Sequence, residues 1–520
     1  MLSVPIRIFM PLDDTLRDLN FCDMTPDKTP STSNGCSGQS KPTFMATNKK
    51  FLFSLVLFLE ALVIAFALME RFPPSGDDYS YLYQAKLFAS GELYAQDALY
   101  DGANPLHNCV GTSCIADNHG RRFSKYPPGW PAFLALGALT GTPWLIDPIL
   151  GAILVFLILR YVGQRMGENL VNVAGTLLIL CLFVCYYTAS LRAHIACALF
   201  VFAAFLAYDA SQQRPQCSRL LLFGAGALLG YSSMIRYLDW IPLAAWIGVA
   251  LARRKMFTQL TFFAIGFGFL ATGNLLYDML LSGHPLETPT ALNHSPGIHD
   301  RLMVSWTGLQ LTGVRLVNLL WVFPPALLLV VLWKRYQPSS KVNMYLVLFL
   351  MNVGIYAFYP AGAGGPGPRY LLAYFPFLIL AVVDVRRWIN HDCGAGPRRL
   401  WTLAIILQIV ASVSFVTKES YASYWRRDLQ RTVRQTGHGR KIFFLETGTY
   451  PASNAGDLTR NPPVLSSAKN LYFIWCDQFE RDALLRRFPG RKVFVYEYPG
   501  GLHRLVDSQP LRSSTTKNHP

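Results

Sequence analysis

The fold is decided by residues 51–94, which read FLFSLVLFLEALVIAFALMERFPPSGDDYSYLYQAKLFASGELY. The stretch begins with an apolar run of about 20 residues, which is the length that a helix needs to cross about 30 Å of hydrocarbon. Two adjacent carboxylates, Asp77 and Asp78, follow soon after that run ends. Acids beside a membrane span either cap a helix or belong to a working site.

The composition agrees with a membrane location. Of the 520 residues, 52% are hydrophobic and 15% are charged, and the mean hydropathy is +0.27. Soluble proteins carry about 25% charged residues, so the deficit predicts a membrane protein. The net charge of +16 could indicate nucleic-acid binding. The basic residues, however, lie in short clusters between apolar runs, so the expected partner is the lipid bilayer and not nucleic acid.

The apolar runs predict an all-α polytopic membrane protein with about 11 transmembrane helices. The predicted spans are 51–70, 143–162, 170–188, 191–210, 219–234, 238–252, 256–280, 314–333, 342–360, 369–385 and 400–417. Loops that this threading places inside carry basic clusters such as Arg253, Arg254 and Lys255, whereas the short outside loops carry single arginines. The positive-inside rule therefore predicts a cytoplasmic N-terminus in a multi-pass protein of the cell inner (plasma) membrane.

Three domains are expected. Residues 1–50 predict a disordered cytoplasmic tail, and Met45, which opens a short basic stretch before the first span, is predicted to be the real start of translation. Residues 51–417 form the transmembrane domain with an outer loop, 71–142. In that loop YPPGWPAFLALGAL (126–139) predicts a re-entrant or interfacial helix, because a further span would reverse every later loop. Residues 418–520, with runs such as KIFFLE and KVFVYEY, predict a small extracytoplasmic α/β domain.

Polar residues gather at the outer ends of the predicted spans. They are Asp77 and Asp78; Lys125 and Tyr126; Arg192 and His194; Arg236 and Asp239; His284, His294, His299, Asp300 and Arg301; and Arg369. Charges at a membrane edge are functional candidates. Each also has a structural interpretation: the acids can cap a helix, Arg236 and Arg369 can reach lipid phosphate, and His194 can bond within a helical interface.

This layout suits chemistry on a phosphate-bearing amphiphile whose tail stays in the bilayer. A carboxylate can take the proton of an attacking hydroxyl group. Arginines can stabilise the negative charge that develops on a departing phosphate. The glycine run GAGGPGPR before the last-but-one span is either a flexible loop or a backbone that approaches an anion.

Cys109 and Cys114 lie in the first outer loop, where a local disulfide is expected. The weaker alternative is a metal site that adds His107 and His119. Glu60 lies in the middle of the first span, where a carboxyl group must be protonated or paired.

The order of these motifs resembles the GT-C-type glycosyltransferases, in the branch related to dolichyl-phosphate-mannose protein mannosyltransferases and the lipid A 4-amino-4-deoxyarabinose transferase. The matching stretches are SGDDYSYLYQAKLFASGELY (75–94), FSKYPPGWPAFLALGAL (123–139) and, less specifically, GPGPRYLLAYFPFL (365–378). The likeness covers most of residues 51–417 and implies a polyprenyl-phosphate sugar donor with an outer-loop Asp as base.

Carried onto this sequence, the resemblance implies that Asp77 is the base, with Asp78 where the family usually has Glu. It implies that Arg369 and Lys125 bind the donor phosphate, although Tyr126 intervenes before Pro-Pro; we add Arg236 to that clamp. Tyr126, His194, Arg192 and Asp239 are expected to bind substrate. No Asp-x-Asp signature occurs at this site, so neither a metal nor another cofactor is expected.

The predicted function is a membrane glycosyltransferase that moves a hexose or pentose from a polyprenyl-phosphate donor to an unknown acceptor hydroxyl at the outer face. Inversion at the sugar carbon is expected. The alternative is a transporter or flippase for lipid-linked sugars, for which Glu60 is the main argument and a repeat of the spans would be needed.

Overall fold

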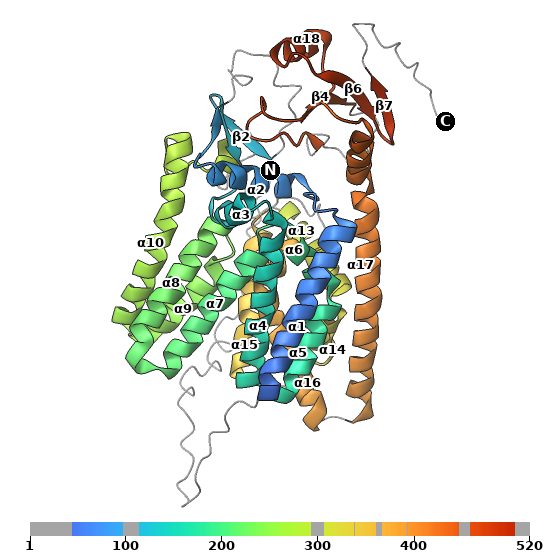
Figure 1. Ribbon diagram of the computed structural model, residues 1–520. Helices are drawn as coiled ribbons and strands as arrows, with labels where there is room; N and C mark the ends of the chain where they lie inside the picture. The colour runs from blue at the N-terminus through green and yellow to red at the C-terminus, as the bar shows by residue number, and fades with distance from the viewer. Residues whose placement is uncertain are drawn as a thin grey trace, which may run out of the picture.

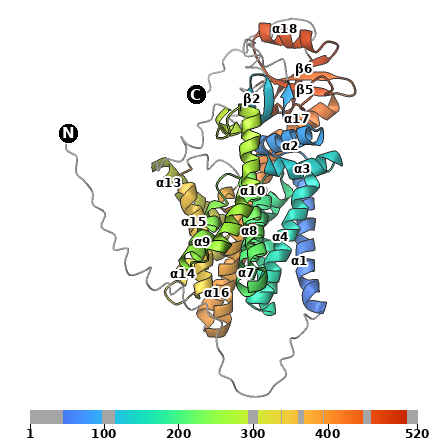
Figure 2. The same cartoon turned by 90° about the vertical axis from the view of Figure 1, so that its left-hand side faces the viewer.

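Long apolar helices form a bundle that carries a small sheet domain at one end (Figures 1 and 2). The computed structural model describes residues 44–96, 114–292, 306–336, 338–359, 367–392, 394–446 and 458–504. Seven helical segments in these ranges are long and apolar enough to cross a membrane. They contain α1 (Phe44–Val63) with the π-helix η2 (Ile64–Leu68), α4 (Ile146–Arg165), α7 (His194–Gln213), α8 (Ser218–Ile235), α10 (Phe257–Ser282), α15 (Ser340–Ala357) and α17 (Ala395–Gln435).

Two further pairs of apolar helices are bent at a break, as a broken span or a re-entrant loop would be. Helix α5 (Val171–Leu180) meets α6 (Leu182–Ala189) at 64°, and α13 (Trp306–Val322) meets the segment Pro324–Val331, which contains α14 (Leu327–Val331), at 108°. The second break falls at Pro324 and Pro325, which lack the N–H groups that a continuous helix needs.

Helix α17 supplies the hydrogen bonds that both breaks lose. Gln408 Nε2 donates to Val322 O at 3.1 Å and to Leu180 O at 3.3 Å. Ser412 Oγ donates to the same Leu180 carbonyl at 2.5 Å. Broken helices are tolerated at membrane depth only where neighbouring side chains satisfy the freed backbone groups, so these two residues make both breaks possible.

The predicted all-α polytopic fold is confirmed, while its span number stays a prediction. Every one of the predicted spans is helical, including the short α9 (Ile241–Arg253) and the pair η9 (Arg369–Tyr374) and α16 (Phe375–Asp392). By length and composition the described residues give seven spans, or nine when each bent pair counts as one. The two predicted spans that the count of nine leaves out are α9, which is short, and α16, which is more polar.

Small residues bring α8 and α10 into close contact. A Cβ atom at Gly226 would lie 2.0 Å from Phe263 O, and one at Gly266 would lie 2.1 Å from Phe223 O. This is the close approach that small-xxx-small patterns allow between membrane helices. It fixes the end of α8, which leads to Arg236.

Two short helices lie across the end of the bundle beneath the sheet domain (Figure 2). They are α2 (Gly76–Ala89) and α3 (Gly129–Leu139). Between them β1 (Ala95–Gln96), β2 (Ile115–Asn118) and β3 (Arg121–Ser124) pair antiparallel in the order β1-β3-β2. With 11 residues α3 is too short to span, as expected for 126–139.

The C-terminal domain is a four-stranded sheet in the order β5-β4-β6-β7. Its elements are β4 (Lys441–Leu445), β5 (Asn470–Ile474), α18 (Gln478–Arg487), β6 (Lys492–Glu497) and β7 (Gly501–Arg504). Strand β4 is parallel to both neighbours, and β7 is antiparallel to β6. Helix α17 continues without interruption through the predicted boundary at residue 418.

The predicted N-terminal tail is described only at its end. Residues 1–43 lie outside the described residues, and residues 44–50 belong to helix α1 rather than to a disordered segment. Lys50 at this end of the bundle forms an ion pair with Glu168 at 2.6 Å, which ties α1 to the loop before α5. The suggested start at Met45 stays a prediction.

Candidate active site

Helix α2 begins at the point where the two adjacent acids lie. Ser75 is its N-cap, and the Ser75 side chain accepts a hydrogen bond from the Asp78 amide at 3.4 Å. Asp77 and Asp78 occupy the first turn, where negative charge is favoured by the helix dipole. Successive helical residues point about 100° apart, so the two carboxylates enter different environments.

Asp78 is fully buried and fully engaged. Its Oδ1 accepts from the Leu191 amide at 2.9 Å, and its Oδ2 accepts from Arg192 Nε at 3.1 Å. Ser75 Oγ also donates to Oδ2. Arg192 is 4% exposed and also donates to the Tyr187 hydroxyl at 3.0 Å. This closed ion pair fastens α2 to the turn between α6 and α7.

Asp77, by contrast, is partly exposed. Its side chain is 24% exposed, its Oδ2 lies 3.4 Å from Arg369 Nη1, and its Oδ1 accepts a hydrogen bond from the Tyr126 hydroxyl. Burial raises the pKa of Asp77, but the charges of Arg369, Lys125 and Arg192 and the Tyr126 hydrogen bond outweigh it and hold the pKa well below its usual value. Asp77 is therefore ionised at neutral pH, the state that a proton acceptor requires.

The residues before the Pro-Pro turn complete this first cluster. Lys125 and Tyr126 directly follow strand β3. The Tyr126 ring stacks on Tyr81 of α2, with 4.6 Å between the ring centroids. Burial lowers the pKa of Lys125, but the neighbouring Cys114 and Asp77 more than offset this, and the net shift is upward. Lys125 is therefore a stable cation beside Asp77.

A second cluster contains Arg236, Asp239 and His194. Arg236 forms an ion pair with Asp239 and approaches His194 Nε2 at 3.0 Å. It also donates to the Tyr356 hydroxyl at 3.0 Å, which in turn donates to Asp239 Oδ1 at 2.5 Å. Asp239 therefore balances the charge of Arg236 within the protein.

The aromatic ring of Tyr370 joins the two clusters. The guanidinium carbons of Arg315 and Arg369 each lie 5.1 Å from its centroid, and that of Arg236 lies 5.5 Å away. Arg369 Nη2 also donates to the Tyr370 hydroxyl at 3.2 Å. Cation–π attraction of this kind holds arginine side chains without neutralising them.

Arg315 is a site residue that the sequence analysis missed. It lies on α13, is 2% exposed, and donates to the Tyr356 carbonyl at 2.5 Å and to the Tyr359 carbonyl at 3.0 Å. The available signal was a lone arginine inside the apolar helix WTGLQLTGVRLVNLLWV, since charged residues in spans are rare and usually functional. Tyr370 and Tyr356 carried no comparable signal.

Among the described residues, the predicted His284 is not brought to the site. His284 is exposed beyond the end of α10, where its ring accepts from the Leu286 amide at 3.3 Å. His294, His299, Asp300, Arg301, residues 362–366 of the glycine run and Cys109 lie outside the described residues. In the described ranges, no group of three or more His, Cys, Asp or Glu residues could hold a metal ion.

The expected disulfide between Cys109 and Cys114 stays a prediction, because Cys109 lies outside the described residues. Cys114 is a buried thiol whose sulfur lies 3.7 Å from Asp77 Oδ1. Strand β2 begins directly after Cys114 and turns its sulfur toward the site. Cys476 of the C-terminal domain, in contrast, is disulfide-bonded.

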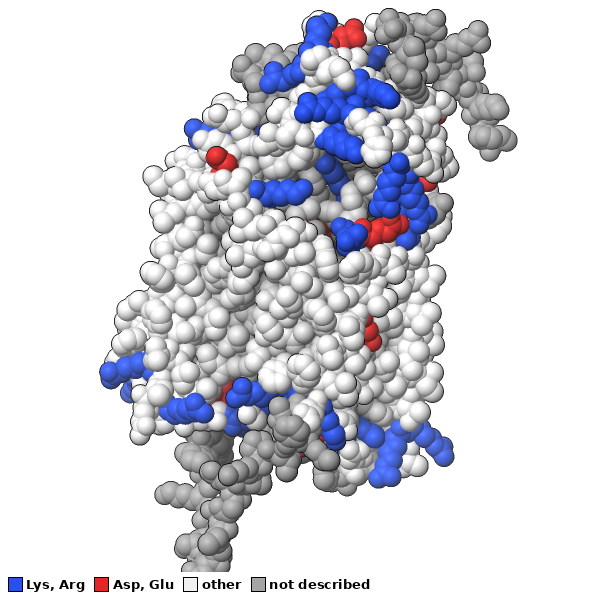
Figure 3. Space-filling model, viewed as in Figure 1, with Lys and Arg blue, Asp and Glu red and all other residues white. Residues whose placement is uncertain are grey.

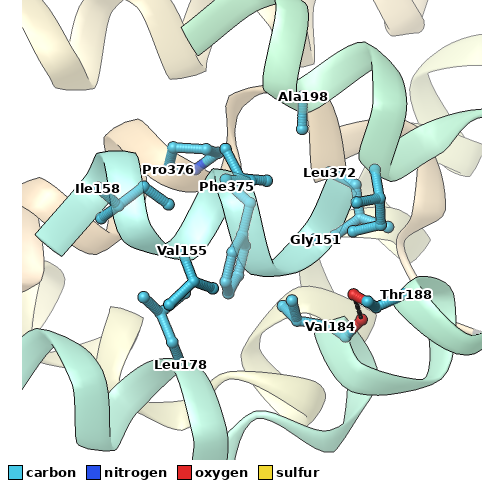
Figure 4. A pocket seen from close by; sticks show the side chains of 12 residues that line it. Gly151, Val155, Ile158, Leu178, Val184, Thr188, Ala198, Leu372, Phe375 and Pro376 are labelled. Atoms are coloured by element: carbon cyan, nitrogen blue, oxygen red, sulfur yellow. Dashed lines mark hydrogen bonds between the residues drawn. The ribbon is translucent and has the colours of Figure 1, made fainter. Parts of the chain in front are cut away.

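Below this site the bundle is closely packed. Figure 4 shows a pocket between α4, α6, α7 and the start of α16, with Val155, Val184 and Phe375 among its lining residues. The space is about 10 Å³, enough for about one water molecule. Deeper in the bundle, the Cys185 thiol donates to the intramembrane Glu60 at 3.2 Å, so that carboxyl group is paired.

The fold is that of a multi-pass membrane protein, and its helical arrangement is similar to that of solved ArnT structures. Two crystal structures of ArnT from Cupriavidus metallidurans are similar to the chain. The structure bound to undecaprenyl phosphate has a TM-score of 0.55 at 12% identity, covering 85% of this chain and 92% of that one. The apo structure has a TM-score of 0.51 at 14% identity, covering 87% and 93%.

This likeness confirms the predicted fold class, and at such low identity it concerns the fold alone. No protein-family model matches the chain. No curated protein matches it either.

Proposed function

We propose that the protein is a membrane glycosyltransferase that transfers a sugar from a polyprenyl-phosphate donor to an acceptor hydroxyl. The observation that carries the proposal is the partly exposed Asp77 carboxylate, which lies beside Arg369, Lys125 and Tyr126 at one end of a membrane bundle. The undecaprenyl phosphate bound to the structurally similar ArnT supports a polyprenyl-phosphate donor. We place this end of the bundle on the extracytoplasmic side of the inner membrane, following the basic clusters of the opposite loops.

The proposed reaction is a single displacement with inversion. Asp77 accepts the acceptor's hydroxyl proton while the hydroxyl oxygen forms a bond to the anomeric carbon of the sugar. The bond from that carbon to the phosphate oxygen breaks, and its electron pair stays on the polyprenyl phosphate. Arg369 and Lys125 stabilise this charge, with Arg236 and Arg315 behind them around Tyr370.

The Asp77–Arg369 pair gives donor binding a chemical consequence. Without a donor phosphate nearby, Arg369 lowers the pKa of Asp77, which makes Asp77 a weak base. A donor phosphate that engages Arg369 draws that charge away from Asp77. The pKa of Asp77 then rises toward its ordinary value, so the base becomes more effective when the donor is in place.

The remaining predicted residues receive supporting roles in this proposal. Arg192 positions α2 through Asp78, and Asp239 orients Arg236. Of the predicted substrate-binding residues, we assign substrate binding to His194, because its buried Nδ1 has no hydrogen-bond partner among the described residues. With Nε2 accepting from Arg236, Nδ1 carries the proton and can donate to a sugar oxygen.

The test is transfer of a labelled sugar from synthetic polyprenyl-phosphate donors in reconstituted membranes. Asp77→Asn is expected to abolish transfer while the protein stays folded. Transfer by Asp77→Asn at the wild-type rate would overturn the proposal. The transporter alternative predicts that labelled donor crosses a vesicle membrane without sugar transfer, and the same vesicles measure this.

A further inference from the structure

A second basic site lies on the far side of α2 from Asp77. It is a groove of about 400 Å³ between α2, the turn before it and the C-terminal domain. That volume is within the range of ligand pockets. Its basic residues are Arg71, Lys86, Arg460 and Lys469.

Helical geometry separates this groove from the active site. Tyr79, Tyr83 and Lys86 of α2 line the groove. At about 100° per residue they point about 180° to 240° away from Asp77 around the helix axis. One short helix therefore serves two sites on opposite faces.

The walls of the groove are held by specific contacts between the two domains. The Tyr79 hydroxyl donates to the Asn461 carbonyl, and Arg460 donates to the Pro73 carbonyl. The Arg460 guanidinium also lies 4.1 Å from the Phe72 ring centroid. Asn461 is itself fixed to the sheet by two hydrogen bonds with the Tyr472 backbone at 2.7 Å.

All the charged residues that line the groove in the described part of the chain are basic. Four of its 14 lining residues are basic and none is acidic. Glu70, which precedes Arg71 in the sequence, instead pairs with Arg431 at 3.3 Å and Arg434 at 3.6 Å. Burial lowers the pKa of Lys86, as it does for an ammonium group partly removed from water. Figure 3 shows Lys and Arg gathered toward the end of the molecule that carries the sheet domain, above a wide belt with few charged residues.

The level of the groove relative to the bilayer identifies the ligand. Arg71 and Phe72 follow within a few residues of Leu68, where the first candidate span ends. A site at that level meets lipid headgroups, and clusters of Lys and Arg at a membrane surface attract anionic lipids. We propose that this groove binds the phosphate of an anionic lipid headgroup between the C-terminal domain and α2.

Native mass spectrometry of the full chain in detergent, titrated with phosphatidylglycerol, tests this directly. The Lys86→Gln/Lys469→Gln variant is expected to bind one phosphatidylglycerol about 30-fold more weakly, because each basic residue near an anionic lipid contributes about fivefold. The matched control, Arg486→Gln/Arg487→Gln, removes the same charge from the exposed end of α18 and is expected to bind as the wild type does.

Equal binding by the groove variant and the control would overturn the proposal. Inorganic phosphate serves as competitor at the lipid's concentration. Little displacement supports a lipid headgroup, whereas full displacement would identify free phosphate as the ligand and overturn the lipid assignment. The inference does not depend on the proposed transferase activity, because lipid binding is measured without a sugar donor.

Discussion

Asp77 and Asp78 lie in the same turn of α2 and each pairs with an arginine, but one ion pair is buried and the other is partly exposed. Asp78 and Arg192 are 0% and 4% exposed and meet at 3.1 Å, with further hydrogen bonds to the Leu191 amide and the Tyr187 hydroxyl. Asp77 and Arg369 are 24% and 15% exposed and meet at 3.4 Å. The closed pair is suited to hold structure, because its charges are balanced and removed from water. The open pair is suited to exchange partners with a substrate.

The largest effect is expected from Asp77→Asn. A positioned general base contributes about 10²- to 10⁴-fold, so transfer should fall by that factor. The unfolding temperature should stay close to that of the wild type, since Asp77 is partly exposed. Labelled sugar transfer and thermal unfolding are the measurements, and a large loss of stability would contradict the contrast between the two acids.

The reciprocal effect is expected from Asp78→Asn. Breaking a buried ion pair leaves the buried Arg192 without its counter-ion and costs about 3–5 kcal/mol in unfolding free energy. The double variant Asp78→Asn/Arg192→Gln should lose less than the sum of the single losses, because it removes both charges. Strictly additive losses in thermal or denaturant unfolding would show that the pair is not coupled.

A smaller effect is expected from Arg369→Gln, which keeps a polar side chain but removes the charge. The donor KM should rise by about 10- to 100-fold, as the loss of one charge-assisted phosphate contact implies. Since Arg369 lowers the pKa of Asp77, its removal raises that pKa. The acid limb of the pH–rate profile should therefore move to higher pH. An unchanged limb would mean that Asp77 is not the titrating base.

The smallest effect is expected from Tyr126→Phe. It removes one hydrogen bond to the Asp77 carboxylate, which is worth about 1.5–3 kcal/mol when the acceptor is charged. We expect a fall in kcat of about tenfold with an unchanged donor KM. A rise in KM alone would assign Tyr126 to donor binding instead.

Local patterns in the sequence were enough for the main elements of the fold. Each apolar run that was predicted as a span is helical in the structure. The Pro-Pro-Gly start and short length of 126–139 predicted the helix that lies across the end of the bundle. The motif around Asp77 and the lone Arg369 predicted two residues that the structure brings together. In each case the signal lay within one helix or at its end.

Features that depend on distant contacts were not predictable. The different partners of Asp77 and Asp78 depend on Arg369 and on the turn at Leu191, both more than a hundred residues away. The Cys114 thiol faces Asp77 because β2 pairs with β3, which spacing in the sequence does not reveal. Arg315 became a site residue only when Tyr370 was placed beside it.

Helix α17 has a mechanical consequence. Its 41 residues make a rod of about 60 Å, twice the thickness of the hydrocarbon layer. Its first half carries Gln408 and Ser412 against both bent helix pairs, and its last residues run toward the sheet domain. The C-terminal domain is therefore joined to the membrane bundle by a continuous helix rather than by a flexible linker. Ligand binding in the groove beside α2 could tilt the C-terminal domain. Because α17 is continuous and contacts both bent helix pairs, that tilt would also displace them.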